Sequence, residues 1–453
     1  MKKLLVANRG EIARRIFRSA KLRNIATVAV YSEADSQSAH VAEADEAVAI
    51  GGSPARDSYL NAEKVLNAAK TMGADAVHPG YGFLSENAEF AEAVVAAGLI
   101  WIGPAPDALR SMGDKARARA LAETAGLPVV PGSSRVGPGD DIDLMAEARS
   151  IGFPLLVKAS AGGGGIGMRR VDDPGKLLAT VEDTQSMAGK AFGDATIFLE
   201  RFVPRARHVE IQVFGFGNGE AIHLFERDCS LQRRFQKVIE EGPAPDLPAD
   251  LRARMAHAAV ALCRKVNYSG AGTVEFILDI ETLEFFFLEM NTRIQVEHPV
   301  SEMITGRDLV GMQIDFARGT LKGLEQSEII SQGHAIECRL YAENPAKMFM
   351  PSPGTLHVFT LPEQTNDLRV DAGYRQGDVV TPYYDPMLAK IIAHGANRQA
   401  TASRAVEALR AIQVEGLVTN KDFLIACLES AEFLAAEIHT GFIDVHRKTL
   451  LAT

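Results

Sequence analysis

The most chemically informative stretch of this sequence is a run of alternating polar side chains that directly follows four apolar residues, 285–288. In a strand, side chains at every second position share one face. An extended chain would therefore direct two carboxylates, two amides and one guanidinium into a single space. The residues of this set are Glu289, Asn291, Arg293, Gln295 and Glu297.

Such alternation has two interpretations. A solvated edge strand shows the same pattern. However, the preceding run Phe285–Phe287 needs cover on both sides, which indicates a central strand, and there a carboxylate is costly unless it is paired or bound to a metal. We therefore interpret the run as part of a binding or catalytic site and expect its strand to be central.

A second pattern brings two of the acidic residues together. The segments 273–278 and 284–290 are typical of an antiparallel hairpin with its turn near 280–283. In one register Glu275 lies opposite Glu289, and two like charges there repel unless a divalent cation lies between them. Carboxylates together with substrate phosphates are ligands that Mg²⁺ prefers, so the sequence predicts a magnesium site.

A glycine-rich loop at 161–168 follows a predicted buried strand that carries Lys158 near its end. Five glycines in so short a segment suit backbone N–H groups that wrap an anion, and the lysine suits phosphate neutralisation. The loop is not a Walker A motif because its lysine precedes the glycines. A flexible hairpin tip with a surface lysine is the alternative.

Composition limits the class of protein. The chain has 453 residues, 47% hydrophobic and 23% charged, enough for about three domains. Its formal net charge of -10 argues against a nucleic-acid partner. Four cysteines without CxxC spacing predict reduced core thiols, and no apolar run has the length of a membrane span. The first apolar run ends too early for a signal peptide, so we expect a location in the cytoplasm, or in an organelle matrix after processing.

The order of elements predicts α/β and α+β architecture. In residues 1–113 short β-like runs alternate with helical patterns, which is typical of a parallel sheet. The expected strands are 4–7, 27–31, 47–50, 74–78 and 99–102. The first turn lacks the glycines of a dinucleotide fingerprint, which argues against a nicotinamide cofactor. The loop 78–83 follows a strand, where ligands bind in such sheets.

The remaining regions are 114–330, with strands and helical insertions, 331–446, an expected α+β lobe, and 447–453, a tail. Along 207–213, His208, Glu210 and Gln212 are predicted to share one strand face. Arg339 follows an apolar run. Its spacing leaves open whether it is a buried salt-bridge arginine or an anion contact.

Together these motifs closely resemble biotin carboxylase, a member of the ATP-grasp superfamily. The likeness extends from Ala7–Ala13 to about residue 446, and includes His78–Asn87 and Glu226–Pro245. It implies an ATP-grasp fold with an N-terminal Rossmann-like domain (1–113), an ATP-grasp domain (114–330) and a C-terminal biotin carboxylase domain (331–446).

The resemblance implies ATP-dependent carboxylation of biotin by bicarbonate through carboxyphosphate, with Mg²⁺ or Mn²⁺. This is the first half-reaction of biotin-dependent acyl-CoA carboxylases, such as those of fatty acid biosynthesis. The implied nucleotide contacts are Lys115, Lys158, Gly164, Gly165, Met168, Glu200, Arg201, Val203, His208, Gln232, Glu275 and Glu289. The implied metal ligands are Glu275, Glu289 and Asn291. Bicarbonate and biotin are assigned to Tyr81, Lys237, Arg293, Gln295, Val296 and Arg339, and Glu297 is the implied base.

The sequence has no Ala-Met-Lys-Met biotinylation motif. We therefore expect biotin on another polypeptide or on a further C-terminal part. The implied partners are a biotin carboxyl carrier protein or domain, a carboxyltransferase subunit and a second copy in a homodimer. Two alternatives remain open: another ATP-grasp ligase, and a nucleotide-binding subunit with weakened catalysis.

Two positions depart from the pattern of this family. Ile166 stands where members carry arginine or lysine, and Phe235 stands where a nucleotide-contacting histidine is usual. The loss of one charge-assisted contact costs roughly 1.5 to 3 kcal/mol. That corresponds to about one to two orders of magnitude in affinity or rate. Phe235 can instead stack on the nucleotide ring.

We therefore expect an active enzyme with altered nucleotide handling. The double variant Ile166→Arg with Phe235→His should raise kcat/KM for ATP roughly tenfold or more, because each change restores a polar contact. Steady-state kinetics at saturating bicarbonate measure this. Identical ATP kinetics in the variant and the wild type would contradict the expectation.

Overall fold

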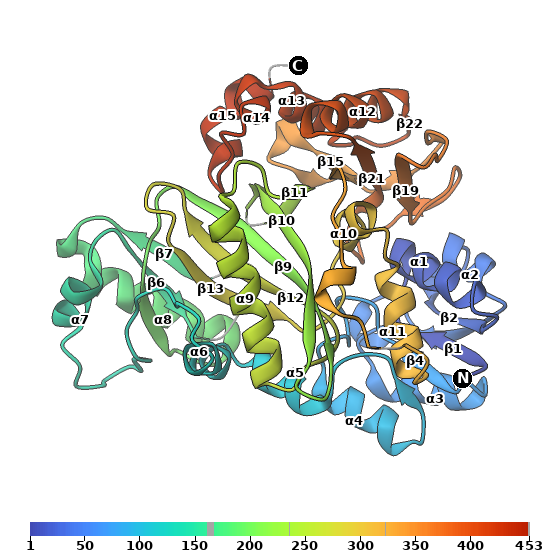
Figure 1. The fold of residues 1–453 in the computed structure, drawn as a ribbon, viewed down its shortest axis with the longest axis horizontal. Coiled ribbons are helices and arrows are strands. Elements are labelled where there is room, and N and C mark those ends of the chain that lie inside the picture. The colour runs from blue at the N-terminus through green and yellow to red at the C-terminus, as the bar shows by residue number, and fades with distance from the viewer. Residues whose placement is uncertain (161–166, 235, 322, 452–453) are drawn as a thin grey trace.

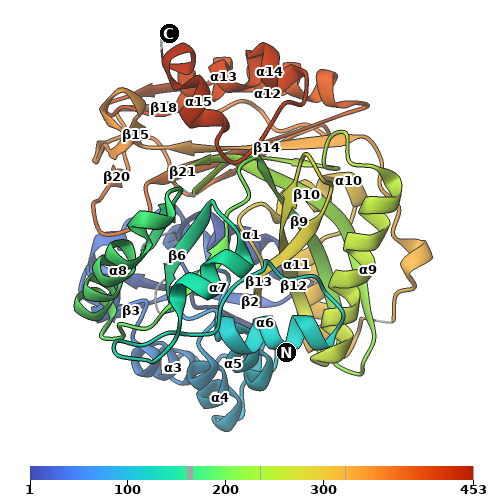
Figure 2. The same cartoon turned by 90° about the vertical axis from the view of Figure 1, so that its left-hand side faces the viewer.

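The structure is a computed structural model that describes residues 1–160, 167–234, 236–321 and 323–451. Figure 1 shows an N-terminal part, a small lobe with β6, β7, α7 and α8, a large central sheet crossed by α9, and a C-terminal lobe. In the turned view of Figure 2 the C-terminal lobe lies above the other parts and the small lobe faces the viewer.

A parallel five-stranded sheet forms the N-terminal part, in the order β3-β2-β1-β4-β5. The apolar strands β1, β2 and β4 are largely buried because helices cover both faces, whereas β3 at the edge is mostly accessible. All five strands predicted here are present. The elements are β1 (Lys3–Val6), α1 (Gly10–Lys21), β2 (Ala26–Ser32), α2 (Ala39–Glu43), β3 (Glu46–Gly51), α3 (Ala62–Thr71), β4 (Ala76–His78), α4 (Ala88–Ala96), β5 (Ile100–Trp101) and α5 (Pro106–Gly113).

The small lobe has its own three-stranded antiparallel sheet, in the order β7-β6-β8, and its own apolar cluster. The strand expected before the glycine-rich loop is β6, and Lys158 lies in it. The elements of this region are α6 (Lys115–Thr124), α7 (Leu144–Ile151), β6 (Leu155–Ala159), β7 (Met168–Val171), α8 (Leu177–Phe192) and β8 (Ile197–Arg201).

An eight-stranded antiparallel sheet forms the centre, in the order β13-β12-β9-β10-β11-β14-β21-β19. Its strand β9 is buried on both faces: α9 packs on the face of Val209, Ile211 and Val213, and the opposite face carries polar side chains that pair with Arg227 of β10. The elements up to residue 330 are β9 (Ala206–Phe216), β10 (Ala221–Arg233), β11 (Gln236–Gly242), α9 (Ala249–Lys265), β12 (Ser269–Asp279), β13 (Phe285–Asn291), α10 (His298–Thr305) and α11 (Leu309–Ala317).

The same sheet continues past residue 330, since β14 pairs with β11. The C-terminal lobe then adds short hairpins and helices, as expected for an α+β lobe. Its elements are β14 (His334–Tyr341), β15 (Glu343–Asn344), β16 (Met350–Pro351), β17 (Gly354–Thr355), β18 (Val358–Thr360), β19 (Leu368–Ala372), β20 (Val379–Val380), β21 (Met387–Gly395), α12 (Arg398–Ala411), β22 (Gln413–Glu415), α13 (Lys421–Glu429), α14 (Ala431–Leu434) and α15 (Phe442–Leu450). Residues 447–450 of the expected tail therefore belong to α15, and Leu450 is buried.

The expectations for β13 need two corrections. The strand lies at the edge of its sheet and is not central. Its phenylalanines are covered by the 128–130 segment, whose Pro128 carbonyl accepts a hydrogen bond from the Phe287 N–H at 2.7 Å, and by the cluster that includes α6. In addition, the extended geometry ends at Asn291, and residues 292–297 form a loop before α10.

The four cysteines are buried and free, as predicted for reduced core thiols. Within the described ranges, no helix combines the length and the apolarity that a bilayer crossing requires.

Candidate active site

A cavity of about 460 Å³ lies between the small lobe and the large sheet. Most of the predicted site residues line it: Lys115, Lys158, Met168, Glu200, Arg201, Val203, His208, Gln232, Lys237, Glu275, Glu289, Asn291, Arg293, Gln295, Val296, Glu297 and Arg339. The predicted contacts Gly164 and Gly165, and the departures Ile166 and Phe235, lie outside the described residues. The alternating side chains from Glu289 to Glu297 thus line one cavity, although only residues 289–291 of this run belong to a strand.

The ammonium of Lys237, on β11, is the centre of the polar side of this cavity. It lies 2.7 Å from Glu210 Oε2, 2.9 Å from Glu275 Oε1 and 2.7 Å from Glu297 Oε1. These carboxylates come from β9, from β12 and from the loop that follows β13. Antiparallel register places Glu210 directly opposite Glu275, so the cation neutralises two adjacent anions.

Glu297 is held as a carboxylate. Burial alone would raise its pKa, but Lys237 and Arg339 together keep that pKa well below its usual range. Arg339 Nη2 donates to Glu297 Oε2 at 2.9 Å and lies 2.5 Å from Glu240 Oε1. Arg339 is therefore both a buried salt-bridge arginine and a cation at the cavity wall.

The hairpin of β12 and β13 pairs Glu275 directly with Glu289, as predicted. Burial and the charge of Glu275 raise the pKa of Glu289. Burial would also raise the pKa of Glu275, but Lys237 and His208 lower it well below its usual range. His208 Nε2 lies 2.8 Å from Glu275 Oε2, and Asn291 Nδ2 donates to Glu275 Oε1 at 2.8 Å. Glu275 and Glu289 thus place carboxylates at opposed positions of adjacent strands, and carboxylate oxygens are ligands that a hard divalent cation prefers.

The cations at the rim have partners from elsewhere in the fold. Arg293 Nε donates to Glu86 Oε2 at 3.0 Å, and its Nη2 donates to Asn291 Oδ1 at 2.9 Å. Lys158 Nζ lies 2.6 Å from Glu200 Oε1 across the β6–β8 pair. These contacts tie the N-terminal part and the small lobe to the cavity.

The other side of the cavity is apolar, which suits a flat ring system. Its lining side chains include Leu156, Phe202, Ile277 and Leu288. Gln232, another lining residue, has its Nε2 2.7 Å from His208 Nδ1. The cavity thus has an apolar end and a highly charged end, a combination that fits a nucleotide with its phosphates directed toward the carboxylates and lysines.

Tyr81 does not line this cavity. It lies in a neighbouring cavity of about 450 Å³, which shares Gln236, Val296 and Arg339 with the first cavity. The lining of this second cavity includes the aromatic residues Tyr374 and Tyr384. Burial raises the pKa of Tyr81, and its hydroxyl donates to Glu11. The two cavities therefore meet at Arg339.

Sequence reasoning missed a fully buried arginine beneath the site. Arg227 donates to Glu210 Oε1 at 2.6 Å, to Gln212 Oε1 at 2.8 Å and to Gln295 Oε1 at 3.0 Å. It joins two residues that were predicted to share a strand face with His208. The alternation along β9 indicated the polar face that Arg227 contacts. Arg227 itself lies on β10, and the pairing of these two strands cannot be read from the alternation.

Three family descriptions match consecutive parts of this chain. Residues 1–109 match "Biotin carboxylase, N-terminal domain", residues 114–324 match "Carbamoyl-phosphate synthase L chain, ATP binding domain" and residues 337–445 match "Biotin carboxylase C-terminal domain".

Relatives match over the whole chain. Biotin carboxylase 1 of Bacillus subtilis (strain 168) is 46% identical over 98% of this chain and 99% of its own length. The mitochondrial methylcrotonoyl-CoA carboxylase subunit alpha of Glycine max is 49% identical over 99% of this chain, which spans 61% of that subunit.

A similar solved structure is the biotin carboxylase domain dimer of Hydrogenobacter thermophilus 2-oxoglutarate carboxylase, in complex with MgADP, ADP and bicarbonate. Its TM-score is 0.93, with 40% identity, 100% of this chain and 99% of that chain covered. The chain therefore belongs to the biotin carboxylase family of ATP-dependent ligases, and the predicted family and fold class are confirmed.

The paired carboxylates give a test of the site's electrostatics. Without divalent cations, Glu289→Gln should raise the free energy of unfolding at pH 7 by up to about 1 kcal/mol, because it removes a like charge opposite Glu275. A raised carboxyl pKa means that ionised Glu289 destabilises the fold. The gain should therefore shrink as the pH falls through the pKa of Glu289.

Denaturant unfolding between pH 4 and pH 8 measures this, with Glu281→Gln in the exposed hairpin turn as the control. With saturating Mg²⁺ the wild type should instead have the higher free energy of unfolding, because it binds the cation with both carboxylates. A variant that is less stable than the wild type in EDTA would contradict the expectation.

Proposed function

We propose that this chain transfers CO₂ from bicarbonate to biotin in an ATP-dependent reaction through carboxyphosphate. The observation that supports this proposal best is the shared set of Lys237, Arg293, Gln295, Arg339 and Glu297 at the charged end of one cavity. A ligase that activates a different carboxylate needs ATP and metal contacts but has no need of a base between two cations.

Bicarbonate is a poor nucleophile, so its proton must be removed as it attacks the γ-phosphate of ATP. Glu297 is the proposed base. Lys237 and Arg293, with the Gln295 amide and Val296, hold the anion in line with the phosphate. The Gln295 side chain is held in place by two contacts: its amide donates to Glu275 Oε1 at 2.8 Å, and its oxygen accepts from Arg227 at 3.0 Å.

The low pKa of Glu297 has a direct bearing on its role as base. Lys237 and Arg339 both contact this carboxylate, and an incoming anion competes for the same two cations. Bicarbonate therefore weakens the contacts that depress the pKa and adds a like charge nearby. Both effects raise the pKa of Glu297, and its basicity increases when the substrate arrives.

The nucleotide is proposed to lie with its base along the apolar wall and its phosphates near Lys115, Lys158 and His208. Met168, Glu200, Arg201, Val203 and Gln232 complete its contacts, with Gly164 and Gly165 as predicted from the sequence. Glu275, Glu289 and Asn291 would hold Mg²⁺ or Mn²⁺, which neutralises charge on the phosphates when it is bound.

Biotin is proposed to enter through the second cavity, past Tyr81. Carboxyphosphate would break down to CO₂ and phosphate, the phosphate would take the ureido N–H proton of biotin, and the deprotonated nitrogen would attack CO₂ to form the new N–C bond. Arg339 lies where the two cavities meet and would stabilise the biotin enolate.

We further propose partners, a location and domain boundaries for this chain. They comprise a separate biotin carrier protein or domain, a carboxyltransferase partner, a homodimer, a cytoplasmic location and the domain boundaries near residues 113 and 330.

The activity itself is the first test. Purified protein should hydrolyse ATP in a bicarbonate-dependent manner, and free biotin should increase the rate, because biotin consumes the CO₂ released in the site. Coupled ADP release measures this. No response to bicarbonate or biotin would favour a nucleotide-binding subunit without catalysis.

The base is tested by Glu297→Gln, which keeps the shape but cannot accept the proton. Bicarbonate-dependent ATP hydrolysis should fall roughly 10²- to 10⁴-fold, the usual contribution of a general base. The control is Glu226→Gln, a buried carboxylate outside the cavity that accepts from Arg252 at 2.6 Å. Equal rates for the wild type and Glu297→Gln would remove Glu297 from the mechanism.

A further inference from the structure

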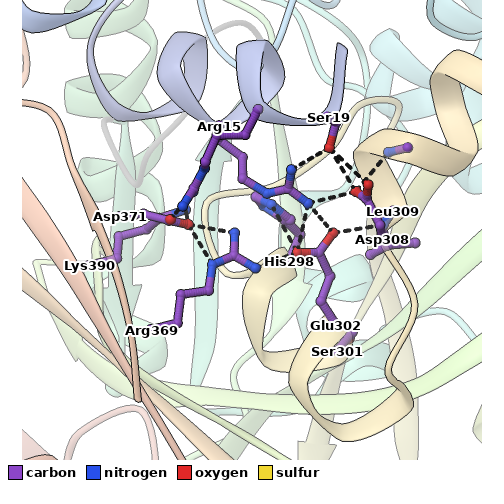
Figure 3. Close-up of polar contacts among 12 residues, drawn as sticks. Arg15, Ser19, His298, Ser301, Glu302, Asp308, Leu309, Arg369, Asp371 and Lys390 are labelled. Atoms are coloured by element: carbon purple, nitrogen blue, oxygen red, sulfur yellow. Dashed lines mark hydrogen bonds and ion pairs between the residues drawn. The ribbon is translucent and has the colours of Figure 1, made fainter. Parts of the chain in front are cut away.

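A buried network of charged residues joins α1, α10 and β19 (Figure 3), and α10 directly follows the active-site loop, residues 292–297. Asp371 on β19 accepts from Arg369 Nη2 at 2.6 Å, and Arg369 Nη1 donates to Glu302 Oε2 on α10 at 2.6 Å. Glu302 also accepts from Arg15 Nη2 on α1 at 2.8 Å. The network therefore links α10 to both the N-terminal part and the C-terminal lobe.

Lys390 connects this network to the active-site loop. Its side chain is fully buried, and its Nζ lies 3.2 Å from Glu11 Oε2 and 3.9 Å from Asp371 Oδ2. The same ammonium donates to the backbone carbonyl of Val296 at 2.8 Å. Within the described part of the chain, Val296 is the only residue assigned above to a substrate or metal that forms a hydrogen bond or ion pair with Lys390.

The place of Lys390 follows from strand register. It lies directly opposite Arg339 in the β14–β21 pair and directly opposite Asp371 in the β19–β21 pair. Opposed residues of an antiparallel pair share a face, so Lys390 and Arg339 both face the loop before α10. One sheet thus supplies the cation that contacts the Glu297 carboxylate and the cation that contacts the preceding peptide.

The loop needs such support because residues 292–297 belong to no strand or helix. Two of its carbonyls have side-chain donors from the surrounding structure. The Gln295 carbonyl is paired with His298 Nδ1 at 2.7 Å, and the Val296 carbonyl accepts from Lys390. The Val296 carbonyl belongs to the peptide that leads into Glu297. Its orientation therefore sets the direction in which the Glu297 side chain leaves the backbone.

We propose that Lys390 is a positioning residue for catalysis, which holds the peptide between Val296 and Glu297 so that the Glu297 carboxylate faces bicarbonate. This inference rests on the proposed function, since it assumes that Glu297 is the base. Lys390 touches no reacting atom. Its effect is on the alignment of the base, and a misplacement of about 1 Å at a reacting group can cost roughly 10²-fold in rate.

The test is Lys390→Met, which keeps the length of the side chain and removes its ammonium. We expect kcat for bicarbonate-dependent ATP hydrolysis to fall roughly 10- to 100-fold, with the KM for ATP changed less than about twofold. Binding of a fluorescent ADP analogue should be unchanged. This split between kcat and nucleotide affinity separates misalignment of the base from general loss of structure.

The matched control is Arg23→Met, which removes a cation from the far end of the same network. Arg23 pairs with Asp308 at 3.2 Å and with Asp315 at 2.9 Å, and Asp308 in turn pairs with Arg15 at 2.7 Å. Among the described residues, no hydrogen bond or ion pair joins the Arg23 side chain to the 292–297 loop. The Arg23→Met variant should have a lower melting temperature than the wild type. Its kcat, measured well below that temperature, should equal the wild-type value. Equal kcat losses in the two variants would overturn the proposal, as would a wild-type kcat in Lys390→Met.

A second variant covers the case in which Lys390→Met does not fold. The double variant Lys390→Met with Glu11→Gln removes the ammonium and the carboxylate that pairs with it, so the local charge balance is kept. The Val296 carbonyl still lacks its hydrogen-bond donor. We expect this folded double variant to keep the low kcat, and recovery of the wild-type kcat would overturn the proposal. A wild-type chain without bicarbonate-dependent hydrolysis would instead overturn the proposed function, and this inference with it.

Discussion

The structure of the site depends on one buried cation. The Lys237 ammonium contacts carboxylates from β9, from β12 and from the loop after β13. Removal of one partner from a buried ion pair typically costs about 3 to 5 kcal/mol, because the remaining charge is left without compensation. Three backbone segments are therefore held at fixed positions around a single nitrogen atom, and any shift in strand register would leave at least one of these carboxylates unpaired.

This arrangement also explains how so many charges coexist where little water reaches. Arg227 and Arg339 provide further cations on either side of Lys237, and each contacts one of the same carboxylates. Without substrate, these cations are therefore paired with carboxylates of the protein itself. A substrate anion must exchange places with them, which favours small, strongly charged ligands that can contact several cations at once.

Much of this could be predicted from the sequence, where local patterns are sufficient. The five parallel strands were predicted because short apolar runs alternate with helical periods, and the opposition of Glu275 and Glu289 followed from hairpin register. The edge position of β13 could not be predicted, because its cover comes from the distant 128–130 segment. The contacts of Arg293 with Glu86 and of Val296 with Lys390 could not be predicted either, since in each pair the two residues lie more than ninety positions apart in the sequence. The roles of the site residues stay predictions until the variants are measured.

The continuity of the central sheet affects how this chain can be divided. The boundary near residue 330 separates two regions by sequence, but β14 from the second region pairs along β11 of the first. A cut in the connecting segment would leave each fragment with an unsatisfied row of backbone donors and acceptors, complementary to the other. The C-terminal lobe thus shares both a sheet and part of its apolar core with the region before residue 330. The two fragments are suited to reassemble noncovalently as a split enzyme, with activity that reports their association.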